Sequence, residues 1–294
     1  MRGLNYMEKL EWSMGKRKTR KNNYLHYFLF GLLIIVSISQ LFPLVWLIDF
    51  SLGKNSDLFG SNILIWPDDP QFINYEIAWI DGKIPTYLWN SIIVNLSSVT
   101  LTVVFSVMLA YAFVRMQWKG KKLISTIVLL GLMIPIHATL LPNFASFNAL
   151  GISNSYLGLI IPYIGFTLPM ATFIMTGFIK SIPVSVEESV VIDGGGIYHI
   201  IRHVIFPLAR PAVITVIIMT FLTTWNEFIM AATFLNSDQY RTLPFAVYNF
   251  AGQYASRYAV QFAVMALVAL PSLLVYILLN EKITKGITVG AVKG

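Results

Sequence analysis

Six long apolar runs, separated by shorter polar segments, make up most of the chain. A helix needs about 20 mostly apolar residues to cross the hydrocarbon core of a bilayer, and each of the six runs is long enough. The pattern therefore predicts an all-α, polytopic membrane helical bundle with six transmembrane helices. The predicted helices cover residues 25–50, 87–114, 123–142, 156–179, 208–234 and 259–279.

Two of these runs carry features that an uninterrupted apolar helix lacks. The third run contains Pro135 and His137, and a proline removes a backbone donor and kinks a helix. Such a break is tolerated where the backbone is buried in protein or faces a cavity, so we expect an interruption there. The second run is rich in Ser, Thr and Asn. These side chains either pack and hydrogen-bond between helices or line a polar path.

The basic residues are distributed unevenly between the two sides of the predicted membrane. With both ends placed in the cytoplasm, all but four of the 21 Lys and Arg residues fall in cytoplasmic segments, the exceptions being Lys54, Lys83, Arg241 and Arg257. This bias is typical of membrane proteins. It accounts for the net charge of +7, so the charge does not indicate nucleic-acid binding. We predict a basic cytoplasmic tail at 1–24, a transmembrane domain at 25–280 and a cytoplasmic tail at 281–294.

The composition excludes several kinds of protein. The chain is 56% apolar and only 12% charged, which is unsuited to a soluble domain of this size. It has no cysteine, so a disulfide framework or a thiolate metal site is excluded. No Gly-x-x-x-x-Gly-Lys-Ser/Thr loop is present to hold nucleotide phosphates, and no nucleophile elbow or pair of catalytic acids is found. His199 and His203 lack a third ligand at an obvious spacing. We therefore predict no catalytic residue, no metal site and no cofactor on this chain.

A polar island at 181–211 interrupts the apolar pattern. It contains Glu187, Glu188 and Asp193, followed by three consecutive glycines that begin at Gly194. After the glycines, apolar residues recur at the spacing that lines one face of a helix: Ile197, Ile200, Ile201, Val204 and Ile205. The pattern predicts a short helix, a glycine turn and a second, amphipathic helix that ends at Pro207. We interpret this segment, 181–207, as a docking element at the membrane surface.

The same segment carries a family resemblance. Glu188, Ser189 and Val190, followed by Asp193–Gly194 and later by Pro207, resemble the cytoplasmic loop of importer-type ABC permeases, which usually begins Glu-Ala-Ala and continues Asp-Gly. Ser189 and Val190 depart from the two alanines. Further matches extend the resemblance over most of the chain, toward the second, six-span permease subunit of maltose-type carbohydrate importers: Ile182–Pro183, Leu208, Pro211, Leu243–Pro244 and the terminal Gly290–Gly294.

The resemblance implies a non-catalytic transport subunit in a bacterial or archaeal cytoplasmic membrane, switching between outward-open and inward-open states. Its implied partners are a second, different permease, two ATP-binding cassette subunits that hold ATP and Mg, an external solute-binding protein, a carbohydrate and membrane lipid. The implied contacts to the ATPase come from the loop and from the C-terminal tail: Glu187, Glu188, Ser189, Asp193, Gly194, Gly195 and Pro207, with Gly290, Val292 and Lys293 in the tail.

The substrate path is predicted from polarity in or beside the apolar runs. The candidates are Asn95, Asn226, Glu227 and Tyr254. Charged groups in a membrane usually face the bundle interior or water, and two alternatives remain open for Glu227. It either has a structural position, near the outer interface or paired to a neighbour, or couples an ion to transport. The second alternative would make the chain a secondary transporter.

Overall fold

The computed structural model describes residues 6–57, 64, 66–250 and 257–291, with side chains described for 24–57, 64, 66–250 and 257–278. All the regular elements in these ranges are helical. Four long helices run without a break: α1 (Tyr6–Leu52), α3 (Ile84–Val114), α6 (Leu157–Ser181) and α12 (Tyr258–Ala291). Their apolar parts have 29, 31, 25 and 21 residues, so each is long enough to cross a bilayer. The first, second, fourth and sixth predicted helices are therefore confirmed.

The third predicted helix bends sharply at Pro135. α4 (Lys121–Leu130) and η2 (Gly131–Met133) turn by 100° into η3 (Ile136–Thr139) and α5 (Leu140–Ala149). Proline disfavours the helical conformation of the residue before it, and Ile134 is extended, with φ −83° and ψ 115°. The expected interruption is confirmed, and its cause is local.

The fifth predicted helix, 208–234, is divided in two. α10 (Arg210–Trp225) ends before a short break, and α11 (Ile229–Phe234) follows it. A second bend, of 79°, separates α10 from the helical segment Ile197–Leu208 that precedes it. When each bent pair is counted as one span, the described residues contain six, and the predicted helical bundle is confirmed.

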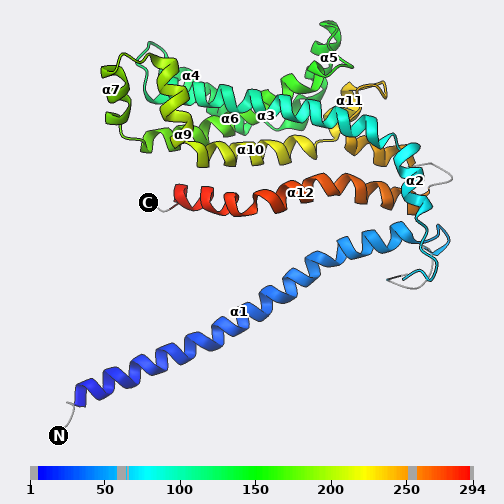
Figure 1. Cartoon of the computed structure of the whole chain (residues 1–294), viewed down its shortest axis with the longest axis horizontal. Coiled ribbons are helices and arrows are strands. Elements are labelled where there is room, and N and C mark those ends of the chain that lie inside the picture. Colours follow the sequence, from blue (N-terminus) through cyan, green and yellow to red (C-terminus); the bar gives the residue numbers. More distant parts are fainter. Residues whose placement is uncertain (1–5, 58–63, 65, 251–256, 292–294) are drawn as a thin grey trace.

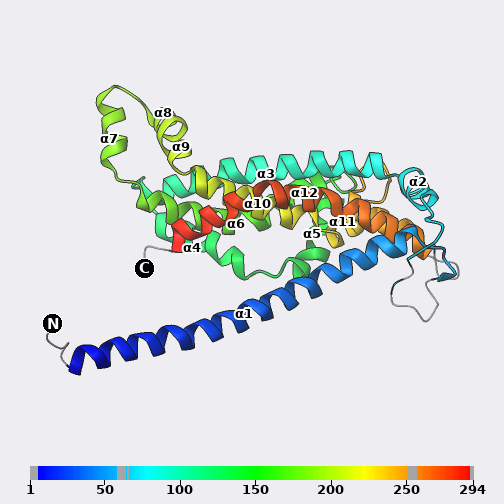
Figure 2. The same cartoon turned by 60° about the horizontal axis from the view of Figure 1, so that its bottom comes forward.

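The helices α3, α4, α6 and α10 lie together, with α12 beside them, while α1 diverges from the bundle toward its N-terminal end (Figures 1 and 2). α1 contacts α12, and the apolar side chains along its span are largely exposed. α1 begins and α12 ends toward the end of the molecule that carries α7 (Ser185–Ile192) (Figure 1). The two short helices α2 (Ile73–Ile80) and η5 (Leu243–Phe250) belong to the opposite end.

One apolar cluster joins three spans to the polar island. Its buried members come from α3, α6, α10 and the helical segment after the glycines, and several are small: Ala110, Ala171, Ala209 and Ala212. Small residues let helices approach closely in a membrane. Four polar side chains of α3 are also buried, each no more than 2% exposed: Asn95, Ser98, Thr102 and Ser106. Most of the polar surface of the second span therefore serves packing.

Candidate functional site

The polar island forms two short helical arms joined by a glycine turn. α7 ends at Ile192 with Asp193 as its C-cap, and Gly194 adopts the left-handed conformation with φ +81°. The N–H of Gly195 donates to the carbonyl of Val190 at 2.8 Å, and the N–H of Gly194 donates to Val191 at 3.0 Å. This pair of bonds is the glycine C-cap that satisfies the last carbonyls of a helix. The predicted turn is thus built as expected.

The second arm consists of α8 (Ile197–Ile200), the π-helical turn η4 (Ile201–Ile205) and α9 (Phe206–Leu208). It is amphipathic, as the apolar spacing predicts. Ile200, Val204 and Ile205 are buried against the bundle, whereas Ile197, at its start, is 39% exposed. The other side carries exposed polar and aromatic side chains: Tyr198, His199, Arg202 and His203. We call α7, the glycine turn and the second arm the docking segment. It stands out from one end of the bundle (Figure 2).

The two adjacent glutamates of α7 differ in burial. Glu188 is exposed, whereas Glu187 is only 6% exposed. The Nε of Arg115, at the end of α3, donates to Oε1 of Glu187 at 2.6 Å, and the hydroxyl of Tyr111 donates to Oε2 at 3.1 Å. The sequence identified Arg115 only as one of the cations predicted to be cytoplasmic, because its partner lies 72 residues away. The remaining loop residues predicted to face a partner lie at the surface, with Gly195 partly buried: Ser189, Asp193, Gly194 and Pro207.

The residues predicted for the substrate path fall in different environments. Asn95 is 2% exposed and donates to the carbonyl of Phe221 and to Oγ1 of Thr224, so it ties α3 to α10. Asn226 is exposed and donates to the carbonyl of Leu222 within its own helix. Tyr254 lies outside the described residues, as do Val292 and Lys293 of the C-terminal tail, while Gly290 lies within α12.

Glu227 lies at the break between α10 and α11 and stabilises it through hydrogen bonds. Its carboxylate accepts hydrogen bonds from the hydroxyl of Tyr163 in α6 at 2.7 Å and from the backbone N–H groups of Met230 and Ala231 at 2.8 and 3.3 Å. An acidic side chain at this position satisfies backbone donors that begin a helix. The side chain is thus engaged on two sides, which favours the structural alternative for Glu227 over an ion-coupling one.

A small hydroxyl-bearing groove lies between α6 and α10. It encloses about 90 Å³ and is lined from both helices by Phe166, Thr167, Met170, Ala171, Ile174, Val216, Met219, Thr220 and Thr223. We call it the α6–α10 groove. The sequence did not predict it because the lining threonines lie on two different apolar runs. Only the pairing of the fourth and fifth spans brings them together.

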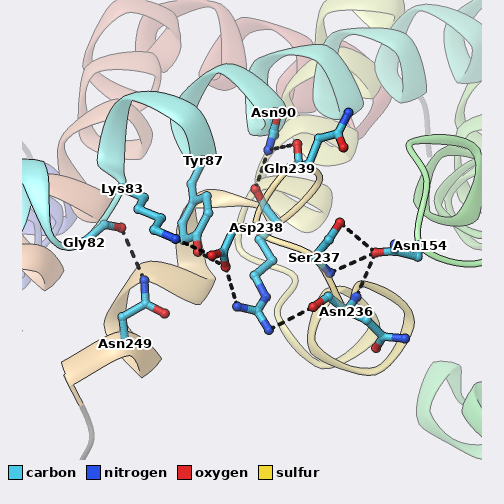
Figure 3. A network of polar contacts seen from close by, with 11 residues as sticks. Gly82, Lys83, Tyr87, Asn90, Asn154, Asn236, Ser237, Asp238, Gln239 and Asn249 are labelled. Carbon is cyan, nitrogen blue, oxygen red and sulfur yellow. Dashed lines mark hydrogen bonds and ion pairs between the residues drawn. The ribbon is translucent and has the colours of Figure 1, made fainter.

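At the opposite end of the bundle, Asp238 organises a polar network (Figure 3). Its carboxylate accepts hydrogen bonds from Lys83, from the hydroxyl of Tyr87 at 2.8 Å and from Arg241 at 2.5 Å. The hydrogen bond from Lys83 is the largest of the effects that lower the pKa of Asp238 to about 2. Asn90 adds bonds from α3 to the carbonyls of Gln239 and Arg241. The network fixes the segment after α11 onto the start of α3.

A second group of hydrogen bonds in the same region involves Asn154, whose φ is +53°. Its Oδ1 accepts from the backbone N–H groups of Asn236 and Ser237 at 2.9 and 3.0 Å (Figure 3). The turn before α6 is thereby joined to the segment after α11. Among the described residues, no three His, Asp or Glu side chains come together as metal ligands.

Comparison with known proteins identifies the family. The family described as "Binding-protein-dependent transport system inner membrane component" matches residues 102–288, which is more than half of the chain. The chain belongs to this family. It is thus a multi-pass protein of a prokaryotic inner membrane and a non-catalytic permease component of an ABC transporter.

Individual relatives agree with this assignment. The permease is 32% identical to the sulfoquinovosyl glycerol transport system permease protein SmoH of Agrobacterium fabrum, over 88% of this chain and 91% of the relative. It is 31% identical to the trehalose transport system permease protein SugB of Mycobacterium tuberculosis, over 86% and 93% of the two chains. A solved bacterial ABC transporter that imports alginate has the same fold, with a TM-score of 0.76, 22% identity and coverage of 89% and 97%.

Proposed function

We propose that this permease forms half of the translocation path for a mono- or oligosaccharide that an external solute-binding protein delivers. The substrates for which its relatives are named support a carbohydrate: sulfoquinovosyl glycerol, diacetylchitobiose, trehalose and galactooligosaccharides. The other half of the path comes from a second, different permease. Two separate subunits, which bind ATP and Mg, drive the cycle.

The docking segment is the observation that carries this proposal. It presents Glu188, Asp193 and Tyr198 at the surface while its apolar face is buried against α3, α6 and α10. When the ATPase closes on ATP, it pulls on this exposed surface, and the buried face transmits the displacement to the three spans. Their movement alternates access to the central path. The sugar biases the switch through its different affinities for the two states.

Further partner contacts are proposed at two other places. The exposed apolar side chains of α1 between Tyr24 and Val45 are suited to lipid and to the second permease, because they find few partners within this chain. By the family resemblance, Gly290, Val292 and Lys293 contact the ATPase.

For the sugar itself, we propose a path that runs along the α6–α10 groove and continues past Asn226. The groove combines the hydroxyls of Thr220 and Thr223 with the ring of Phe166, and Asn226 is exposed at the end of the same helix. Hydroxyls and an aromatic face match the polar groups and C–H surfaces of a sugar. Of the other predicted path residues, Tyr254 stays a prediction, while the contacts of Asn95 and Glu227 support packing roles.

Reconstitution tests the function. The permease, its partner permease and the cognate ATPase are placed in proteoliposomes, solute-binding proteins loaded with different oligosaccharides are added, and ATP hydrolysis and sugar uptake are measured. We expect one loaded binding protein to stimulate both activities, and Glu188→Lys to abolish the stimulation. If no ATPase copurifies and an ion gradient alone drives uptake, the proposal is wrong.

A further inference from the structure

Besides its apolar face, the docking segment contacts the bundle through a buried ion pair between Arg115 and Glu187. Arg115 and Glu187 are 13% and 7% exposed at their side chains, and their atoms approach to 2.6 Å. Arg115 also donates through Nη2 to two carbonyls at the end of α6, those of Ile179 at 3.1 Å and Ile182 at 2.5 Å. One guanidinium therefore touches α3, the end of α6 and α7.

The geometry makes this contact stiff. A guanidinium is planar and presents its donors in a fixed fork, and here the fork is shared between a carboxylate and two helix-end carbonyls. Tyr111, one helical turn before Arg115, holds the second oxygen of Glu187. The carboxylate is thus fixed at both oxygens from the same helix, and α7 cannot shift relative to α3 without breaking a charge-assisted bond.

We propose that Glu187 is a positioning residue that transmits the movement of the docking segment to α3, whereas Glu188, beside it, contacts the ATPase. This inference rests on the proposed function. It assigns transmission of movement to Glu187 and contact with the ATPase to Glu188. In that division, loss of Glu188 weakens assembly with the ATPase. Loss of the Glu187 contact leaves the ATPase bound and lowers the sugar transported for each ATP hydrolysed.

The test compares matched variants in the reconstituted complex. Glu187→Gln removes the charge at constant shape, and Glu188→Gln is the same change at the exposed neighbour. We expect Glu187→Gln to lower the ratio of sugar uptake to ATP hydrolysis at least fivefold with wild-type copurification of the ATPase. We expect Glu188→Gln to reduce copurification at least fivefold, with a near wild-type ratio in the complexes that remain.

A double variant tests whether Glu187 acts through Arg115. If it does, Arg115→Gln combined with Glu187→Gln lowers the ratio no further than the more severe single variant, because both remove the same contact. Losses that multiply would overturn the inference. Tyr111→Phe provides a milder change, since it removes one hydrogen bond and leaves the ion pair. It is expected to lower the ratio about twofold even if the charge variants fail to assemble.

The outcomes distinguish a failure of the proposed function from a failure of the role proposed for Glu187. A wild-type complex without ATP-driven uptake overturns the proposed function. A transporting wild type in which Glu187→Gln and Tyr111→Phe keep the wild-type ratio overturns this inference alone. The same holds if Glu187→Gln acts like Glu188→Gln and only releases the ATPase.

Discussion

The contact between Glu227 and Tyr163 gives a direct test of the structural role of the one acidic residue in the predicted fifth span. Tyr163 is 2% exposed, and its hydroxyl donates to Glu227 at 2.7 Å. Tyr163→Phe removes that hydroxyl and keeps the ring, so no large cavity forms. The carboxylate retains its bonds to the N–H groups of Met230 and Ala231.

The expected cost follows from the kind of bond that is lost. A hydrogen bond to a charged group contributes about 1.5–3 kcal/mol, and the donor here is buried. We therefore expect Tyr163→Phe to destabilise the permease by about 2 kcal/mol, which corresponds to a fall in Tm of about 3 °C for a chain of this size. Glu227→Gln keeps an acceptor for one backbone N–H but loses the charge, so we expect a cost of about 1–2 kcal/mol.

Thermal unfolding of the purified protein, followed by sugar uptake in proteoliposomes, measures both effects. Tyr276→Phe, at a 50% exposed tyrosine in α12, is the control and should leave Tm within about 1 °C. With ATP supplied, Glu227→Gln should retain at least about half of the wild-type uptake, because the residue supports the α10–α11 break and carries no ion. Full stability combined with complete loss of uptake in Glu227→Gln would refute this reasoning and revive the ion-coupled alternative.

Two further predictions concern the ends of the bundle. The fall in the pKa of Asp238 from 3.8 to about 2 corresponds to about 2.4 kcal/mol, which solvent screening of a 41% exposed carboxylate reduces to about 1 kcal/mol. Because the folded pKa is lowered, this stabilisation is complete above about pH 4 and is lost as pH falls toward 2; unfolding curves of Asp238→Asn should lack that loss. A Cβ on Gly195 would lie 2.5 Å from Cγ1 and 2.9 Å from the carbonyl oxygen of Val190, so Gly195→Ala should cost about 1–3 kcal/mol in thermal unfolding. Val190→Ala should relieve part of this cost, and Gly196→Ala, where nothing lies within 4 Å, should be neutral; equal effects of the two glycine variants would contradict the argument.

The features predicted from the sequence depend on signals within a few residues. Apolar length located the unbroken spans, Pro135 located the bend of the third, and the glycines located the turn after α7. The division of the fifth predicted helix was missed because Glu227 stabilises the break with a partner 64 residues away. The burial of Glu187 was missed for the same reason. Glu187 and Glu188 are adjacent residues of the same type, and the sequence does not show that only Glu187 contacts Tyr111 and Arg115 of α3.

These long-range polar contacts decide which parts of the permease move together. α3 has 31 residues, or about 46 Å at about 1.5 Å per residue, and both of its ends are fixed by charge-assisted bonds. Arg115 holds the docking segment at one end, and Lys83 and Tyr87 hold Asp238 at the other. A displacement of the docking segment must therefore carry α3 with it, deform the helix or break one of the two contacts. Because the contact at Arg115 is buried and the one at Lys83 is half exposed, the contact at Lys83 is the weaker of the two. Movement that starts at the docking segment is thus expected to be absorbed first around Asp238.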